Sequence, residues 1–114
     1  MRSLVIGNGV DVIAPANLLL AKGVPVVVFE VSASVYPFDI TSKLISPEDA
    51  VVYSGTLPVY VLADVGDVVL ANNMSPDETI VKQLRGRGHR IIGEFELAAS
   101  YDRGKILAIT GTYF

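Results

Sequence analysis

At 114 residues, the chain has the length of one domain and can form a substantial hydrophobic core. An apolar share of 51 %, a mean hydropathy of +0.49 and only 18 % charged residues are typical of a parallel sheet buried on both faces. The net charge of −3 argues against a nucleic-acid partner, and the absence of cysteine excludes disulfides, thiolate nucleophiles and sulfur-ligated metals.

The first half of the chain predicts strand, helix and strand in succession. A helix is expected where apolar residues recur with a 3.6-residue period, and Gly23 ends it as the first residue past the last turn. Runs that are β-branched and too short for a helix predict strands. The expected elements are a strand over 4–6, a glycine turn over 7–9, a helix over 11–22, a strand over 24–29 and a polar loop over 31–49.

The second half continues the alternation. Ser75 is expected as the N-cap of a helix, with Pro76 in its first turn and Glu78 completing a capping box, and this helix stops at Gly88. The other expected elements are strands over 51–53, 67–70, 90–92 and 105–110, and short helices over 57–63 and 94–100. Strands that alternate with helices in this way predict a Rossmann-like α/β three-layer sandwich with a mainly parallel sheet of five to six strands.

A membrane-spanning segment or a signal peptide in the sequence would indicate where the protein is located. No apolar run approaches the roughly 18 residues needed to span a membrane. The first predicted strand begins almost at Met1, which leaves no room for a signal peptide. We therefore expect a cytoplasmic protein without a membrane partner.

In such sheets, ligands bind at the carboxyl ends of the strands, where the strand order reverses. Three loops, over 7–12, 30–34 and 71–74, are therefore candidates. Gly7 and Gly9 allow a tight turn that a diphosphate can approach, and the following helix would supply free amides. Val12 stands in place of the third glycine of the usual pattern, so a purely structural strand-to-helix turn is the alternative.

Two acidic residues bear on this site. Glu30 lies at the end of the second strand, 21 residues after Gly9, where an acid often accepts hydrogen bonds from ribose hydroxyls; the alternative is a solvated carboxylate. Asp11 is expected to cap its own helix and to repel an anion nearby. A sugar hydroxyl or a base is therefore a better ligand for this turn than a bare phosphate.

No catalytic residue and no metal site are expected. Ser, Thr and Asp occur without triad order, and His89, the sole histidine, is assigned to the surface. Asp77 and Glu78 are explained by the first turn of a helix, where the helix dipole favours acids. The basic residues Arg85, Arg87 and Arg90 are interpreted, with His89, as a solvated helix end.

Three stretches of the sequence resemble the Mur ligase family. The run GNGVDVIAPANLLLAKGVPVVVFE, residues 7–30, is similar to the opening of these ligases, which has a G-x-G-x-[ST]-G turn, a helix ending in Ala-x-Gly and a strand ending in an acid. IGEFEL, residues 92–97, resembles the family's I-G-E-x-E-L, and ILAITGT, residues 106–112, is similar to the strand that enters its ATP-binding P-loop. The resemblance covers essentially the whole chain, as the first of three domains.

The resemblance implies an ATP-dependent amide ligase of peptidoglycan precursor synthesis. In that family, the N-terminal domain holds the UDP part of UDP-N-acetylmuramoyl-L-alanine. The central domain binds ATP and magnesium and forms an acyl phosphate, and the C-terminal domain brings D-glutamate. Residues 1–110 would then be the UDP-substrate domain and residues 111–114 the start of the linker or P-loop. Such a domain would be inactive alone, with no cofactor of its own and the other two domains as its partners.

The family's site residues carry over onto matching positions here. The resemblance implies three groups around the substrate and one that begins the ATP loop. They are Gly7, Gly9, Val10 and Asp11 at the uridine diphosphate, Glu30, Val31 and Ser32 beside the uracil or ribose, Ala71, Asn72 and Asn73 closing the pocket, and Thr110, Gly111 and Thr112 in the ATP loop.

The chain also departs from the family pattern. Val12 replaces the third glycine, Asp11 a hydroxyl residue and Ser32 an arginine, and Ala-Asn-Asn at 71–73 replaces Ser-Pro-Gly. Two lost charge-assisted hydrogen bonds, at about 1.5–3 kcal/mol each, would weaken UDP binding by a few hundredfold or more. A stand-alone nucleotide-binding module for NAD, and a structural or interaction domain without a ligand, therefore stay open as alternatives.

Overall fold

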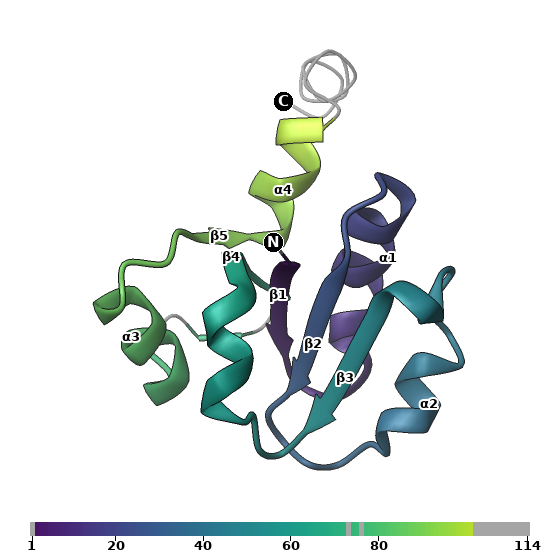
Figure 1. Cartoon of the computed structure of the whole chain (residues 1–114), viewed down its shortest axis with the longest axis horizontal. Coiled ribbons are helices and arrows are strands. Elements are labelled where there is room, and N and C mark those ends of the chain that lie inside the picture. The colour runs from purple at the N-terminus through teal and green to yellow at the C-terminus, as the bar shows by residue number, and fades with distance from the viewer. Residues whose placement is uncertain (1, 73, 76, 102–114) are drawn as a thin grey trace.

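The computed structural model describes residues 2–72, 74–75 and 77–101, and its centre is a five-stranded sheet (Figure 1). The strand order is β3-β2-β1-β4-β5, and every neighbouring pair is parallel, which confirms the predicted α/β class. The strands are β1 (Arg2–Gly7), β2 (Val26–Glu30), β3 (Ala50–Ser54), β4 (Val65–Leu70) and β5 (Ile91–Gly93). The predicted strand over 105–110 lies outside the described residues.

Helices cover both faces of the sheet, which gives the three predicted layers (Figure 1). On one face, Leu19 and Ile40 belong to a core cluster that also includes Leu97. On the other, Leu62 and Leu84 pack in a second cluster. The first face carries α1 (Ile13–Ala21), α2 (Pro37–Thr41) and α4 (Glu94–Tyr101), and the second carries the 3-10 helix η3 (Val59–Asp64) and α3 (Thr79–Gly86).

Two predicted helices and one predicted loop differ from the observed elements. The helix expected over 11–22 opens with a 3-10 turn, η1 (Gly9–Val12), and neither η1 nor α1 has a side-chain cap, so the prediction that Asp11 caps its own helix is wrong. The segment expected over 57–63 is the 3-10 helix η3. The polar loop over 31–49 contains two short helices, α2 and the 3-10 helix η2 (Pro47–Asp49), each with a proline in its first turn, where the missing N–H is tolerated.

The start of α3 also lies later than predicted. The Ser75 hydroxyl accepts a hydrogen bond from the Asp77 amide (3.1 Å), which closes a two-residue turn ahead of the helix. Glu78 occupies the N-cap position in place of Ser75. The predicted stop at Gly88 is confirmed, since this residue has a φ of +91° and its amide bonds the carbonyl of Arg85 (3.0 Å). Across the residues that the structure describes, no helix has the length and apolarity to cross a membrane.

Candidate functional site at the carboxyl edge of the sheet

The strand order reverses between β1 and β4. From β1 the chain builds outward to β2 and β3, and it then crosses back to place β4 on the other side of β1. Ligands of open parallel sheets bind at the carboxyl ends of the two strands that flank such a reversal. The predicted loops after β1, β2 and β4 therefore lie at one edge of the sheet, which the arrowheads of β2 and β3 mark in Figure 1.

Gly7 and Ala71 meet at this reversal. A Cβ atom added to Gly7 would lie 2.7 Å from Cβ of Ala71 and 2.9 Å from Cγ1 of Val12, so a larger residue does not fit. The Ala71 amide also donates to the Ile6 carbonyl (2.8 Å). Val12 is fully buried in the core, so the residue in place of the third glycine packs inward and does not line the edge.

Two backbone amides of the glycine turn already donate hydrogen bonds within the protein. Gly9 has a φ of +55°, and its amide donates to Oε1 of Glu30 (2.9 Å). The Asp11 amide donates to the Asn8 carbonyl (3.1 Å). The expectation of free amides is therefore wrong for these two groups. Val10, with 57 % of its surface exposed, is an apolar residue of the turn that is open to a ligand.

Glu30 is completely buried, so its interpretation as a solvated carboxylate is wrong. Oε1 accepts hydrogen bonds from the Gly9 amide, from the Ser32 amide (2.7 Å) and from the Ser32 hydroxyl, while Oε2 accepts one from the Ser54 hydroxyl (2.8 Å). Burial alone would raise the pKa of this carboxyl, but the bonds from Ser32, Gly9 and Ser54 outweigh burial and lower the pKa from 4.5 to about 2. Glu30 is therefore ionised at neutral pH, and its charge is held by neutral donors.

A second set of contacts holds the loop around this carboxylate. Ser54 lies directly opposite Glu30 in the parallel register of β2 and β3, and its hydroxyl also lies 2.9 Å from the Val35 carbonyl. Ala33 adopts a φ of +58°, and a Cβ atom on Gly55 would lie 2.9 Å from the Ala33 Cβ. Sequence analysis missed Ser54; its place directly after the third predicted strand, over 51–53, was the signal that could have found it.

A small hollow lies beside the glycine turn. Residues 33–36 line a volume of about 180 Å³. An added Cβ on Gly9 would lie 3.8 Å from the Ser34 hydroxyl and 3.8 Å from the Val35 side chain, so the turn and the hollow are neighbours. Tyr36, with 77 % of its surface exposed, stands at this hollow.

The loop after β4 faces the IGEFEL motif. Asn72 is exposed, and its side-chain amide donates to Oε2 of Glu94 (3.3 Å). Both residues line a hollow of about 420 Å³, together with Arg85 and Phe95. Asn73, predicted beside Asn72, lies outside the described residues, as do Thr110, Gly111 and Thr112. Glu94 belongs to the IGEFEL motif but is not among the predicted site residues.

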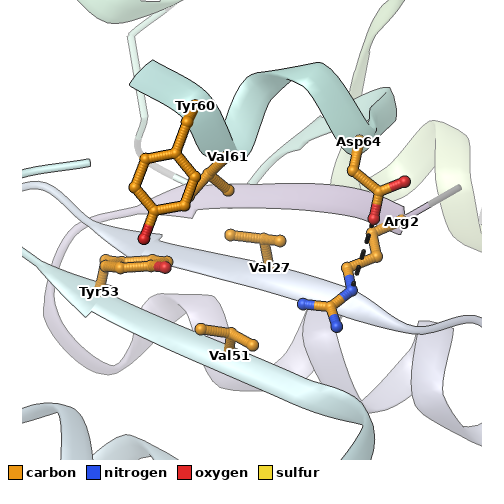
Figure 2. A pocket seen from close by; sticks show the side chains of 7 residues that line it. All are labelled: Arg2, Val27, Val51, Tyr53, Tyr60, Val61 and Asp64. Carbon is orange, nitrogen blue, oxygen red and sulfur yellow. Dashed lines mark ion pairs between the residues drawn. The ribbon is translucent and has the colours of Figure 1, made fainter. Parts of the chain in front are cut away.

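A further hollow of about 200 Å³ lies on the η3 side of the sheet, away from the carboxyl edge of β1 (Figure 2). Figure 2 shows Tyr53 and Tyr60 together at one end and the long Arg2–Asp64 ion pair (3.8 Å) at the other. Burial, reinforced by the Tyr60 hydroxyl, raises the pKa of Tyr53. None of the predicted site residues lines this hollow, so we place the candidate site at the carboxyl edge.

Comparisons with known proteins agree with the family resemblance. No family model matches the chain. It is 32 % identical over 111 residues to the UDP-N-acetylmuramoylalanine–D-glutamate ligase of Lachnoclostridium phytofermentans, and 33 % identical to those of Syntrophus aciditrophicus (111 residues) and Alkaliphilus metalliredigens (113 residues). Each match covers 97 % of this chain but only 24–25 % of the relative, so the chain spans about a quarter of the length of the curated relatives it matches. The chain therefore belongs to the Mur ligase family, as an N-terminal domain of the kind found in UDP-N-acetylmuramoylalanine–D-glutamate ligases.

Proposed function

We propose that this chain is the substrate-recognition domain of a ligase that couples D-glutamate to UDP-N-acetylmuramoyl-L-alanine, and that it holds the UDP part of that substrate. The similarity to ligases of this name over 97 % of the chain is the observation that carries the proposal. In this proposal, residues 1–110 form the recognition domain, and the ATP loop begins at 111–114. ATP, magnesium and the amide-forming step then belong to the central and C-terminal domains of the parent, so the isolated domain is inactive.

The carboxyl edge has room and chemistry for such a ligand. The hollow of about 180 Å³ beside Gly9 can hold a planar base, and the exposed Tyr36 ring offers a stacking surface. Val10, the residue after Gly9, presents an exposed apolar side chain on the turn. The larger hollow around Asn72 and Glu94 lies at the end of β4, and it can take the sugar part of the ligand.

Calorimetric titration of the chain with UDP-N-acetylmuramoyl-L-alanine tests the proposal, with UDP and NAD as comparison ligands. We expect saturable binding of the muramoyl nucleotide, weaker binding of UDP and no heat with NAD. Binding of NAD alone would instead support a dinucleotide-binding module. Silence from all three at millimolar concentration would contradict the proposal for this chain.

A matched pair of variants places the ligand on the edge. Asn72→Ala removes an exposed amide at the end of β4, and we expect it to weaken binding of the muramoyl nucleotide by about three- to tenfold, as for one neutral hydrogen bond. Gln83→Ala, an exposed residue of α3, is the control and should bind as the wild type does. Equal affinities for both variants would exclude Asn72 from the site.

A further inference from the structure

The glycine turn has an anion position, the place where its backbone amides would bind a phosphate, and the Glu30 carboxylate already fills it. Glycine turns that lead into a helix bind phosphate through backbone amides. Here the Gly9 amide donates to the carboxylate of Glu30 (2.9 Å), and the Ser32 amide donates to the same oxygen (2.7 Å). Two hydroxyls, from Ser32 and Ser54, complete the set. These are the kinds of donor that would otherwise surround a phosphate oxygen.

The carboxylate is closed to a ligand by burial. Three donors meet at Oε1 and one at Oε2, and the side chain is fully buried behind them. A ribose hydroxyl could therefore reach the carboxylate only if the loops that carry these donors moved aside. A phosphate group at Gly9 would in turn have to displace the carboxylate or lie against its negative charge. Asp11 adds a second acidic side chain to the same turn.

We propose that the Glu30 carboxylate is the resident anion of the glycine turn, so that this turn recognises only uncharged groups of the ligand and leaves the diphosphate elsewhere. This inference deepens the proposed function and rests on it for the identity of the ligand. Ser54 is then a positioning residue. It lies on β3, remote from the turn in sequence, and its hydroxyl holds the Glu30 carboxylate that accepts the hydrogen bond from the Gly9 amide. The base and ribose contact the turn and the hollow over 33–36, and the diphosphate extends toward the loop after β4.

The first test follows the Gly9 amide by nuclear magnetic resonance in the wild-type chain. Inorganic pyrophosphate at millimolar concentration should leave the Gly9 and Ser32 amide resonances in place. Uridine should shift the resonances of residues 33–36. A saturable shift of the Gly9 amide with pyrophosphate would overturn the proposal, because it would put phosphate on the turn.

The second test empties the anion position. Glu30→Ala leaves the four donors without their acceptor, so added acetate should raise the melting temperature of this variant in a saturable way. Acetate should have no such effect on the wild type or on Glu30→Gln, whose side chain still fills the space. We also expect pyrophosphate to bind Glu30→Ala about tenfold or more tightly than it binds the wild type. A folded Glu30→Ala variant that responds to neither anion would overturn the proposal.

The two proposals fail in distinguishable ways. If uridine, UDP and the muramoyl nucleotide all fail to bind the wild-type chain, the proposed function fails, yet acetate rescue of Glu30→Ala still decides the role of the carboxylate. If the muramoyl nucleotide binds and shifts the Gly9 amide as pyrophosphate does, the proposed function stands and the resident anion is refuted. Should Glu30→Ala not fold even with acetate, the wild-type titration decides alone.

Discussion

Replacing Glu30 with glutamine separates the charge of this side chain from its shape. The wild-type carboxyl has its pKa lowered from 4.5 to about 2 on folding, because hydrogen bonds from Ser32, Gly9 and Ser54 outweigh the opposing effect of burial. At about 1.4 kcal/mol for each pH unit, this difference corresponds to about 3 kcal/mol of stability. Since the pKa is lower in the folded state, this contribution is fully present above pH 4.5. It is lost as the pH falls from there toward 2.

The expected result is a difference between two pH curves. At pH 7, Glu30→Gln should have an unfolding free energy about 3 kcal/mol below that of the wild type, because the amide makes weaker hydrogen bonds and cannot accept all four donors. By pH 3, the wild type should have lost about 2 kcal/mol of this advantage, and near pH 2 the two proteins should converge. Carboxyl groups common to both proteins cancel in the difference.

Urea denaturation followed by far-ultraviolet circular dichroism at several pH values between 7 and 2 measures both curves. Glu48→Gln, which changes an exposed glutamate in η2, is the matched control and should follow the wild type. The explanation is refuted if the gap between Glu30→Gln and the wild type stays constant with pH. It is also refuted if the gap has already closed by pH 4, since a folded pKa of about 2 keeps most of the gap at that pH.

The remaining predictions concern glycines, and thermal or urea unfolding checks each of them. Gly7→Ala should lower the unfolding free energy by about 1–3 kcal/mol, because the new methyl group would lie 2.7 Å from Cβ of Ala71; wild-type stability in this variant would contradict that close approach. Gly86→Ala has open space in α3 and should raise stability by about 0.5–1 kcal/mol, and a loss here would show that its backbone is not helical. Gly55→Ala and Gly23→Ala share positive φ values of +81° and +77° and about 1 kcal/mol of strain, but only Gly55 meets a side-chain carbon at 2.9 Å. Gly55→Ala should therefore be the more damaging by about 1 kcal/mol or more, and equal losses would refute the contact.

The sheet could be predicted from the sequence because each strand has a local sequence signal. Residues 26–30 and 65–70 are apolar or β-branched over most of their length, and the chain alternates them with helical segments. The loops after β1 and β4, with Gly7 and Ala71, do lie side by side at the reversal of strand order, as expected for this fold. Helix type was harder to predict, since residues 59–64 carry apolar residues that suit an α-helix and a 3-10 helix equally.

The partners of Glu30 could not be predicted, because they depend on register. Gly9 is 21 residues away along the chain and Ser54 is 24 residues away, on a different strand. Only the parallel register of β1, β2 and β3 brings these groups together at the carboxyl ends of the three strands. Spacing to Gly9 alone suggested a residue that faces a ligand, whereas the neighbouring strand end encloses it. The roles of Gly7, Val10 and Asn72 toward UDP remain predictions that the titrations above will decide.

The row formed by Gly7, Glu30 and Ser54 in the parallel register has a consequence for engineering this domain. One buried side chain links the loops that follow three separate strands, so these loops cannot be exchanged one at a time. A graft that brings a new β1–α1 turn must keep a donor for Oε1, and a new loop after β3 must keep a donor for Oε2. A variant of this domain that gives these loops a new ligand must therefore change them together, or first replace Glu30.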